Sequence, residues 1–168
     1  MENITLRNWT VQDSYHLVDF INSVNRNYIS NRIPNPYTIQ DAVLWIDNIL
    51  LLNNTDAIFK AIEINNEIIG SISVEKKKDI SIYDSEIGYM ISTKYWNRGI
   101  ATKAVEQICQ EAFALLDVTR ITGNVYHPNI ASQKVLLKNN FVLEGKMKSA
   151  IYKDEHFYDM LIYAKYNE

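Results

Sequence analysis

The chain has little glycine, and what it has is scattered. Only five of its 168 residues are glycine, and no two of them stand close together in the sequence. Phosphate-binding loops of the G-x-G-x-x-G and G-x-x-x-x-G-K-[ST] types need closely spaced glycines, so the sequence excludes both. A phosphorylated ligand would therefore have to bind around a single glycine.

Cysteine and histidine are equally sparse. Cys109 is the single cysteine, and the three histidines lie far apart in the sequence. An intrachain disulfide, a cysteine-based zinc cluster and an H-E-x-x-H zinc site are excluded, and no metal is expected. Because Cys109 lies in the middle of a predicted helix, we expect it to be a small buried hydrophobic residue rather than a nucleophile.

Long apolar runs and excess positive charge are also missing. No apolar stretch is long enough to cross a bilayer, and the first residues lack the basic and apolar regions of a signal peptide. We therefore expect a cytoplasmic protein with no membrane partner. The net charge of −3 argues against a nucleic-acid partner bound through overall positive charge. The length predicts a single domain over residues 1–168.

The hydrophobic pattern predicts an α/β protein with one mixed sheet. Residues 57–64 and 67–75 are rich in β-branched side chains and are separated by two asparagines. Asparagine tolerates positive φ, so these segments are expected to form a hairpin. Further strands are expected at residues 4–9, 85–92, 120–126, 141 onward and 156–166.

Helices are expected between these strands. Thr10 and Thr38 are each followed three residues later by an aspartate and then by apolar residues at helical spacing, which predicts two capped helices. Residues 25–37 connect them, and Pro34 and Pro36 forbid a regular helix in that connection. Two more helices are expected, one after Gly99 and one over residues 131–139.

The junction between the strand at residues 85–92 and the helix after Gly99 is the most informative segment. The first turn of such a helix presents N–H groups without intrahelical partners, and the peptide dipoles favour an anion there. Gly99 lets a ligand approach the backbone closely, and Arg98 is suited to bind phosphate. An ordinary strand-to-helix turn containing one glycine is the alternative.

Residues 95–104, which read YWNRGIATKA, resemble the acyl-CoA signature [QR]-x-x-G-x-[GA] of the GNAT N-acetyltransferase superfamily. More narrowly they resemble the ribosomal-protein N-terminal (Rim-type) branch, in which a tryptophan commonly occupies the position of Trp96. Residues 86–89 and 129–141 are similar to further motifs of that branch. The resemblance implies the GNAT fold, a central mixed β-sheet flanked by helices. It implies acetyl-CoA binding at Met90, Ile91, Ser92, Asn97, Arg98, Gly99, Ile100, Ala101, Thr102 and Asn129.

The resemblance also implies catalytic roles. Glu86 is expected to accept the proton of the amine through water, with a solvated carboxylate at a strand end as the alternative. Ser132 is expected to hydrogen-bond the departing thiolate or the substrate, with a residue of the first helical turn as the alternative. Asn129 is expected to bond the pantetheine arm, which is compatible with a helix cap. Backbone N–H groups of residues 88–92 would polarise the thioester carbonyl, and this requires a bulge.

Two positions depart from the family pattern. Asn140 replaces a glycine, which is tolerated because asparagine accepts left-handed backbone. Leu136 stands where many GNAT enzymes carry a tyrosine that protonates the thiolate, so the general acid is unassigned. This departure motivates an alternative function, a catalytically weak acyl-CoA-binding sensor. Arg32 and Tyr37 are expected to contact the acceptor, with a packed structural loop as the alternative.

Together these features predict a cytoplasmic N-acetyltransferase that transfers an acetyl group from acetyl-CoA to a primary amine. The acceptor is a protein N-terminal α-amine, as in the ribosomal-protein type, or a small-molecule amine. A homodimer is compatible with the resemblance. The acceptor itself is not determined, because one fold supports many substrates.

Overall fold

All seven strands of this computed structural model form one mixed sheet, in the order β1-β2-β3-β4-β5-β7-β6. The structure describes residues 3–167; residues 1, 2 and 168 of the expected 1–168 domain lie outside the described residues. Neighbouring strands are antiparallel except β4 and β5, which confirms the mixed α/β class. The elements are β1 (Thr5–Asn8), α1 (Ser14–Ser23), α2 (Ile39–Leu52), β2 (Ala57–Ile64), β3 (Glu67–Lys76), β4 (Asp84–Ile91), α3 (Ile100–Leu115), β5 (Arg120–Tyr126), α4 (Ile130–Lys138), β6 (Val142–Lys153) and β7 (His156–Tyr166).

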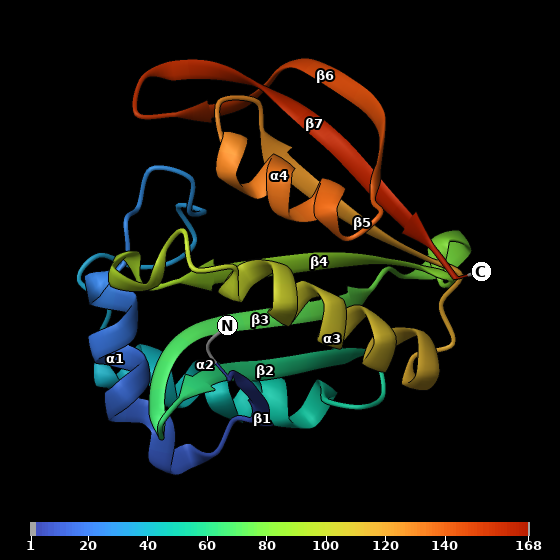
Figure 1. Cartoon of the computed structure of the whole chain (residues 1–168). Coiled ribbons are helices and arrows are strands. Elements are labelled where there is room, and N and C mark those ends of the chain that lie inside the picture. The colour runs from blue at the N-terminus through green and yellow to red at the C-terminus, as the bar shows by residue number, and fades with distance from the viewer. Residues whose placement is uncertain (1–2, 168) are drawn as a thin grey trace.

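Helices cover both faces of the sheet (Figure 1). Apolar side chains of α3 and α4 join those of the sheet in one buried cluster, which includes Cys109. Burial raises the pKa of the Cys109 thiol to about 12, which confirms it as a hydrophobic core residue. The helices α1 and α2 pack on the other face in a second cluster, where Trp45 meets the rings of Trp9 and Phe59 edge to face.

The turns follow the local sequence. Asn65 and Asn66 have φ angles of 50° and 64°, which confirms the asparagine turn of the β2–β3 hairpin. Asn140 adopts a φ of 63°, the left-handed conformation that asparagine was expected to accept at this position. The Thr38 backbone N–H donates to the Asp41 carboxylate at 2.8 Å, and the Asp41 N–H donates back to the Thr38 hydroxyl at 3.3 Å. This reciprocal cap begins α2 where the sequence predicts it.

The sheet opens where β4 and β5 separate. The two strands pair only through residues 84–86 of β4 and 120–122 of β5, after which β5 continues against β7 alone. In Figure 1 they meet near the C-terminus and diverge toward α4. The expected bulge within residues 88–92 is wrong, because β4 keeps an unbroken register with β3 from Ser85 to Ile91. The edge of β4 that faces β5 is unpaired with β5 beyond Glu86 because the two strands separate, and not because β4 contains an extra residue.

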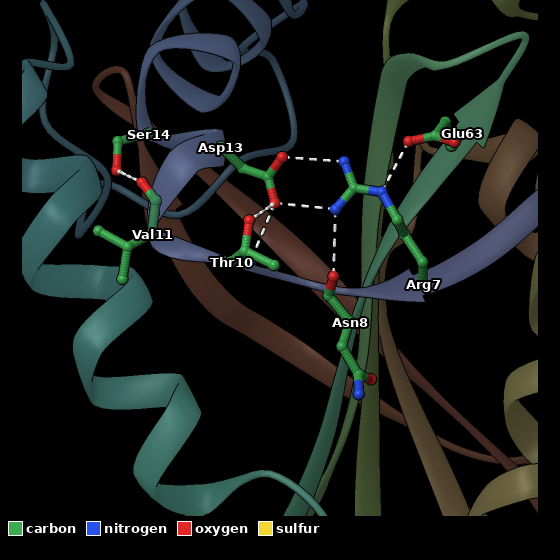
Figure 2. Close-up of polar contacts among 7 residues, drawn as sticks. All are labelled: Arg7, Asn8, Thr10, Val11, Asp13, Ser14 and Glu63. Carbon is green, nitrogen blue, oxygen red and sulfur yellow. Dashed lines mark hydrogen bonds and ion pairs between the residues drawn. The ribbon is translucent and has the colours of Figure 1, made fainter.

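A partly buried ion-pair network joins the first strand to the first helical turn (Figure 2). The Arg7 guanidinium donates to both carboxylate oxygens of Asp13, at 2.8 and 2.9 Å, and to Glu63 at 2.7 Å. The backbone N–H and hydroxyl of Thr10 donate to the same Asp13 carboxylate. Burial alone would raise the pKa of Asp13, but the hydrogen bonds from Arg7 and Thr10 outweigh it and lower the pKa.

We expect Asp13→Asn to lower the free energy of unfolding at neutral pH by about 2 kcal/mol, because it removes the charged partner of Arg7. Because folding lowers the pKa of Asp13, its interactions contribute fully to the free energy of unfolding above the unfolded pKa of about 3.9. This contribution is lost as the pH falls through the lower pKa of the folded state. Urea unfolding at several pH values measures this. Asp47→Asn, on the exposed side of α2, is the matched control. Equal losses in both variants, or an unchanged Asp13→Asn difference in strong acid, would contradict the prediction.

Candidate active site

The gap between β4 and β5 continues into a cleft of about 590 Å³. The end of β4, the turn before α3, the first turn of α3 and one side of α4 form its walls, together with part of the connection between α1 and α2. Most of the predicted acetyl-CoA positions line this cleft, as does the predicted catalytic residue Ser132. They are Met90, Ile91, Asn97, Arg98, Gly99, Ile100, Ala101, Thr102 and Asn129.

Ser92 is the predicted acetyl-CoA residue that does not line the cleft. Its backbone N–H donates to the Ile69 carbonyl at 2.8 Å and is therefore used in pairing with β3. Because N–H directions alternate along a strand, the N–H groups of Tyr89 and Ile91 point to the opposite side, into the gap. The Ile91 carbonyl, on that same side, accepts a hydrogen bond from the Trp96 indole at 2.9 Å.

The turn before α3 lines the cleft and leads into the N-terminus of that helix, where the first N–H groups have no intrahelical partners. Asn97 and Gly99 have φ angles of 61° and 77°, and Gly99 is the N-cap of α3. A β carbon on Gly99 would meet nothing within 4 Å, so the left-handed φ, rather than crowding, favours glycine here. Arg98 lies over the Tyr95 ring at 5.1 Å and donates to the Lys94 carbonyl at 2.9 Å. A left-handed turn leading into a helix N-terminus is suited to bind an anion.

Two cations of the cleft were not predicted from the sequence. Lys134 and Lys138 line it from α4, and they lie four residues apart on one face of that helix. With Arg98 they bring three cationic side chains to the cleft, and no acidic residue is among its described lining residues. The chain as a whole has a net charge of −3, so this is a local concentration of positive charge. The sequence signal that could have identified these two lysines is their i, i+4 spacing in the helix that follows Asn129.

We expect the double variant Lys134→Gln/Lys138→Gln to raise the Kd for CoA about tenfold at low salt, through loss of charge-assisted contacts with phosphate. Because ions screen such contacts, the difference from wild type should shrink at high salt. Calorimetry at two ionic strengths measures both effects. Lys148→Gln, on the exposed surface of β6, is the control and should leave the Kd unchanged. An equal rise in the control, or an effect independent of salt, would count against direct phosphate binding.

Contacts with β5 and β6 hold the connection between α1 and α2 beside this cleft. The buried Lys153 ammonium, at the end of β6, donates to the backbone carbonyls of Arg26 and Ile29, at 2.6 and 2.5 Å. The Tyr28 ring packs against Tyr126 of β5, with ring centroids 5.6 Å apart. Tyr28 and Ile29 both line the cleft, so contacts far apart in sequence complete its wall.

Ser132 faces Tyr89 inside the cleft. The Asn129 side chain accepts a hydrogen bond from the Ser132 N–H at 3.1 Å, which confirms Asn129 as the cap of α4. The Tyr89 hydroxyl lies 2.7 Å from Ser132 Oγ and 3.3 Å from the Ser132 carbonyl oxygen. Leu136 is buried in the core and does not line the cleft. A β carbon on Gly123 would lie 2.8 Å from Leu136 Cδ1, so glycine leaves the space that this leucine fills.

A second pocket, of about 310 Å³, lies beneath the connection between α1 and α2. Arg32 and Tyr37, the predicted acceptor residues, both line it, and Tyr37 is buried among apolar side chains. Trp45 of α2 forms another part of the wall. Met90 lines this pocket and the larger cleft alike, so the two cavities adjoin at the end of β4.

Glu86 lies where β4 and β5 begin to separate. It is the last β4 residue paired with β5, its side chain is exposed, and it lines neither of the two cavities. Strand alternation puts it on the same face of β4 as Met90. Glu75 of β3 is its direct cross-strand partner. Burial and the negative charge of Glu86 raise the pKa of Glu75, against opposing contributions from Ser73 and Arg32.

Within residues 3–167, no group of three or more histidine, cysteine or acidic side chains is arranged to hold a metal ion. In the same part of the chain, no helix has both the length and the apolar character needed to span a bilayer.

The chain matches the family model described as the acetyltransferase (GNAT) domain over residues 3–142, and it belongs to that family. It is 32% identical over 80 residues to the uncharacterized N-acetyltransferase YoaA of Bacillus subtilis, a match covering 48% of this chain and 45% of the relative. It is 27% identical over 100 residues to a ribosomal-protein-serine acetyltransferase of Escherichia coli, covering 60% of this chain and 55% of the relative. The chain thus spans about half the length of these two curated relatives.

The fold is also that of solved acetyltransferases. The Microcin C7 self-immunity acetyltransferase MccE, solved in complex with acetyl-CoA and AMP, superposes with a TM-score of 0.85 at 24% sequence identity. The superposition covers 99% of this chain and 94% of that protein. This similarity confirms the predicted GNAT fold.

Proposed function

We propose that this protein is an acetyl-CoA-dependent N-acetyltransferase that transfers an acetyl group to a primary amine by direct attack on the thioester. The observation that carries the proposal is the cationic cleft, which joins the helix N-terminus at Gly99 to the free side of β4. Such a cleft suits a ligand with phosphates at one end and a hydrogen-bonding arm at the other. MccE, which shares the fold, was solved with acetyl-CoA.

In the proposed reaction, the pyrophosphate of acetyl-CoA binds at the turn before α3 and the pantetheine arm runs along β4. The N–H groups of Tyr89 and Ile91 are directed into the gap, and there they would polarise the thioester carbonyl and stabilise the oxyanion. The amine attacks from the side of the second pocket, and Glu86 accepts its proton through water. A C–N bond forms, the C–S bond breaks, and the bonding electron pair leaves on sulfur beside Ser132.

The acceptor is proposed to be a protein N-terminal α-amine or a small-molecule amine whose adjoining group occupies the second pocket. Arg32 and Tyr37 would contact that group, and the shared residue Met90 supports a path from this pocket to the thioester. The Escherichia coli relative that acts on a ribosomal protein serine favours a protein N-terminus. The walls of this pocket combine apolar side chains such as Trp45 with the charged side chains of Arg32 and Asp41, so they suit an adjoining group that has both apolar and polar parts.

Isotopically labelled acetyl-CoA, added with the protein to a cell extract and followed by mass spectrometry, tests this proposal and identifies the acceptor. We expect labelled acetyl groups on a defined set of amines. A parallel assay follows free CoA thiol with peptides, polyamines and amino acids as acceptors. Tight acetyl-CoA binding without thiol release above background would favour the acyl-CoA sensor that the Leu136 position suggests. Failure to bind acetyl-CoA would contradict both functions.

A further inference from the structure

The stabiliser of the departing thiolate is the part of this chemistry that the family pattern leaves open. Leu136 occupies the usual tyrosine position and is 1% exposed, and it packs in the core outside the cleft. Sulfur must nonetheless leave with an electron pair, in a cleft where Tyr89 and Ser132 hold hydroxyl groups 2.7 Å apart. These hydroxyls come from two elements, β4 and α4.

We infer that Tyr89 is a positioning residue that directs the Ser132 hydroxyl hydrogen toward the CoA sulfur, so that this pair stabilises the thiolate in place of a tyrosine at Leu136. The inference rests on the proposed function, since it requires the sulfur to lie beside Ser132. It adds a positioning residue from β4 to a hydrogen bond that Ser132 of α4 donates.

The number of hydrogens that the two hydroxyl groups can donate supports the positioning role inferred for Tyr89. Each hydroxyl has one hydrogen to donate, and the Tyr89 hydroxyl lies within reach of both Ser132 Oγ and the Ser132 carbonyl oxygen. If Tyr89 donates to the carbonyl, Ser132 can donate to the Tyr89 oxygen and presents no hydrogen to the cleft. If Tyr89 donates to Oγ, the Ser132 hydrogen is free to point to sulfur. A thiolate favours the second arrangement, because only there does it receive a hydrogen bond.

The pair acts by hydrogen bonding and not by releasing a proton. Burial raises the pKa of Tyr89 to about 12, so its hydroxyl stays protonated near neutral pH and remains a donor. When the C–S bond breaks, sulfur takes the electron pair and accepts the hydrogen bond of Ser132. The thiolate then takes its proton from water as CoA is released, and neither Tyr89 nor Ser132 changes its net protonation.

The pKa of the thiol of bound CoA is the direct test, because it requires no acceptor amine. We expect Tyr89→Phe to raise that pKa so that the acid dissociation constant falls about tenfold, through loss of the oriented donor. Ultraviolet absorbance of the thiolate, followed against pH with CoA bound, measures it. Ser132→Ala should give the same rise, and the double variant should add nothing, because the two hydroxyls act as one unit.

Tyr163→Phe is the matched control. Tyr163 of β7 is a buried tyrosine whose hydroxyl donates at 3.3 Å to the side chain of Gln133, the residue next to Ser132 in α4. Unlike Tyr89, it does not line the cleft. It should leave the thiol pKa unchanged. In turnover, Tyr89→Phe should lower kcat about tenfold with the KM for acetyl-CoA within twofold, as expected for an interaction made only in the transition state.

Three outcomes would overturn the inference. If Tyr89→Phe binds CoA normally and leaves the thiol pKa unchanged, the inference fails while the proposed function stands. If Tyr89→Phe does not fold, Ser132→Ala decides, and an unchanged thiol pKa in that variant is equally fatal. If the wild-type protein does not bind CoA at all, the proposed function itself fails and this inference fails with it.

Discussion

Replacing Glu86 with glutamine is expected to lower kcat for amine acetylation about 100-fold, the lower end of what a positioned proton acceptor contributes. The acceptor amine must lose a proton to attack, and glutamine cannot take it. Glu86 is exposed on the Met90 face of β4, at the point where β4 and β5 part, and it lines neither cavity. We therefore expect the Kd for acetyl-CoA to stay within twofold. Steady-state kinetics and calorimetry on the same preparations measure the two quantities.

Glu106→Gln, on the exposed side of α3, is the matched carboxylate-to-amide control and should leave kcat unchanged. Glu75→Gln tests whether the opposing carboxylate substitutes for Glu86. Glu75 faces Glu86 across the strand pair. If Glu86 is the proton acceptor, Glu75→Gln should change kcat much less than Glu86→Gln does. A wild-type rate in Glu86→Gln would remove Glu86 from the mechanism, and a larger loss in Glu75→Gln would transfer the role to Glu75.

Gly70→Ala is expected to lower the free energy of unfolding by about 3 kcal/mol, the upper end of the cost of overpacking. A β carbon at Gly70 would lie 2.8 Å from the Met90 carbonyl oxygen and 3.0 Å from Ile62 Cδ1. The Met90 carbonyl belongs to the backbone of β4, so it cannot rotate away as a side chain would. The strand must shift where it borders both cavities, and we expect weaker acetyl-CoA binding as well.

Gly145→Ala is the control for this substitution. Gly145 lies in β6, and a β carbon there would meet nothing within 4 Å. Denaturant unfolding should place this variant within about 0.5 kcal/mol of wild type. If both glycine variants lose the same stability, the loss at Gly70 does not come from contact with β4. Normal acetyl-CoA affinity in a destabilised Gly70→Ala would show that β4 absorbs the shift without moving the cleft.

Local sequence signals predicted the elements and one wall of the cleft. Asparagine pairs, threonine caps and hydrophobic spacing act over a few residues, so they are readable without the fold. The turn ending at Gly99 was predicted for the same reason, since a helix N-terminus and a left-handed residue are local properties. The bulge expected within residues 88–92 was wrong, because the freedom of that strand comes from its neighbour β5 and not from its own sequence.

The sequence by itself determined the family, the order of elements and the anion-binding turn at Gly99. Only the tertiary structure decided which groups face one another across that turn. Tyr89 and Ser132 are 43 residues apart in the chain, and their hydroxyls meet because α4, which packs against α3 and β5, lies across the cleft from the end of β4. Lys153 reaches the connection near Ile29 over 124 residues for the same kind of reason. Such contacts depend on how strands diverge and helices pack, and no pattern within a short segment specifies that.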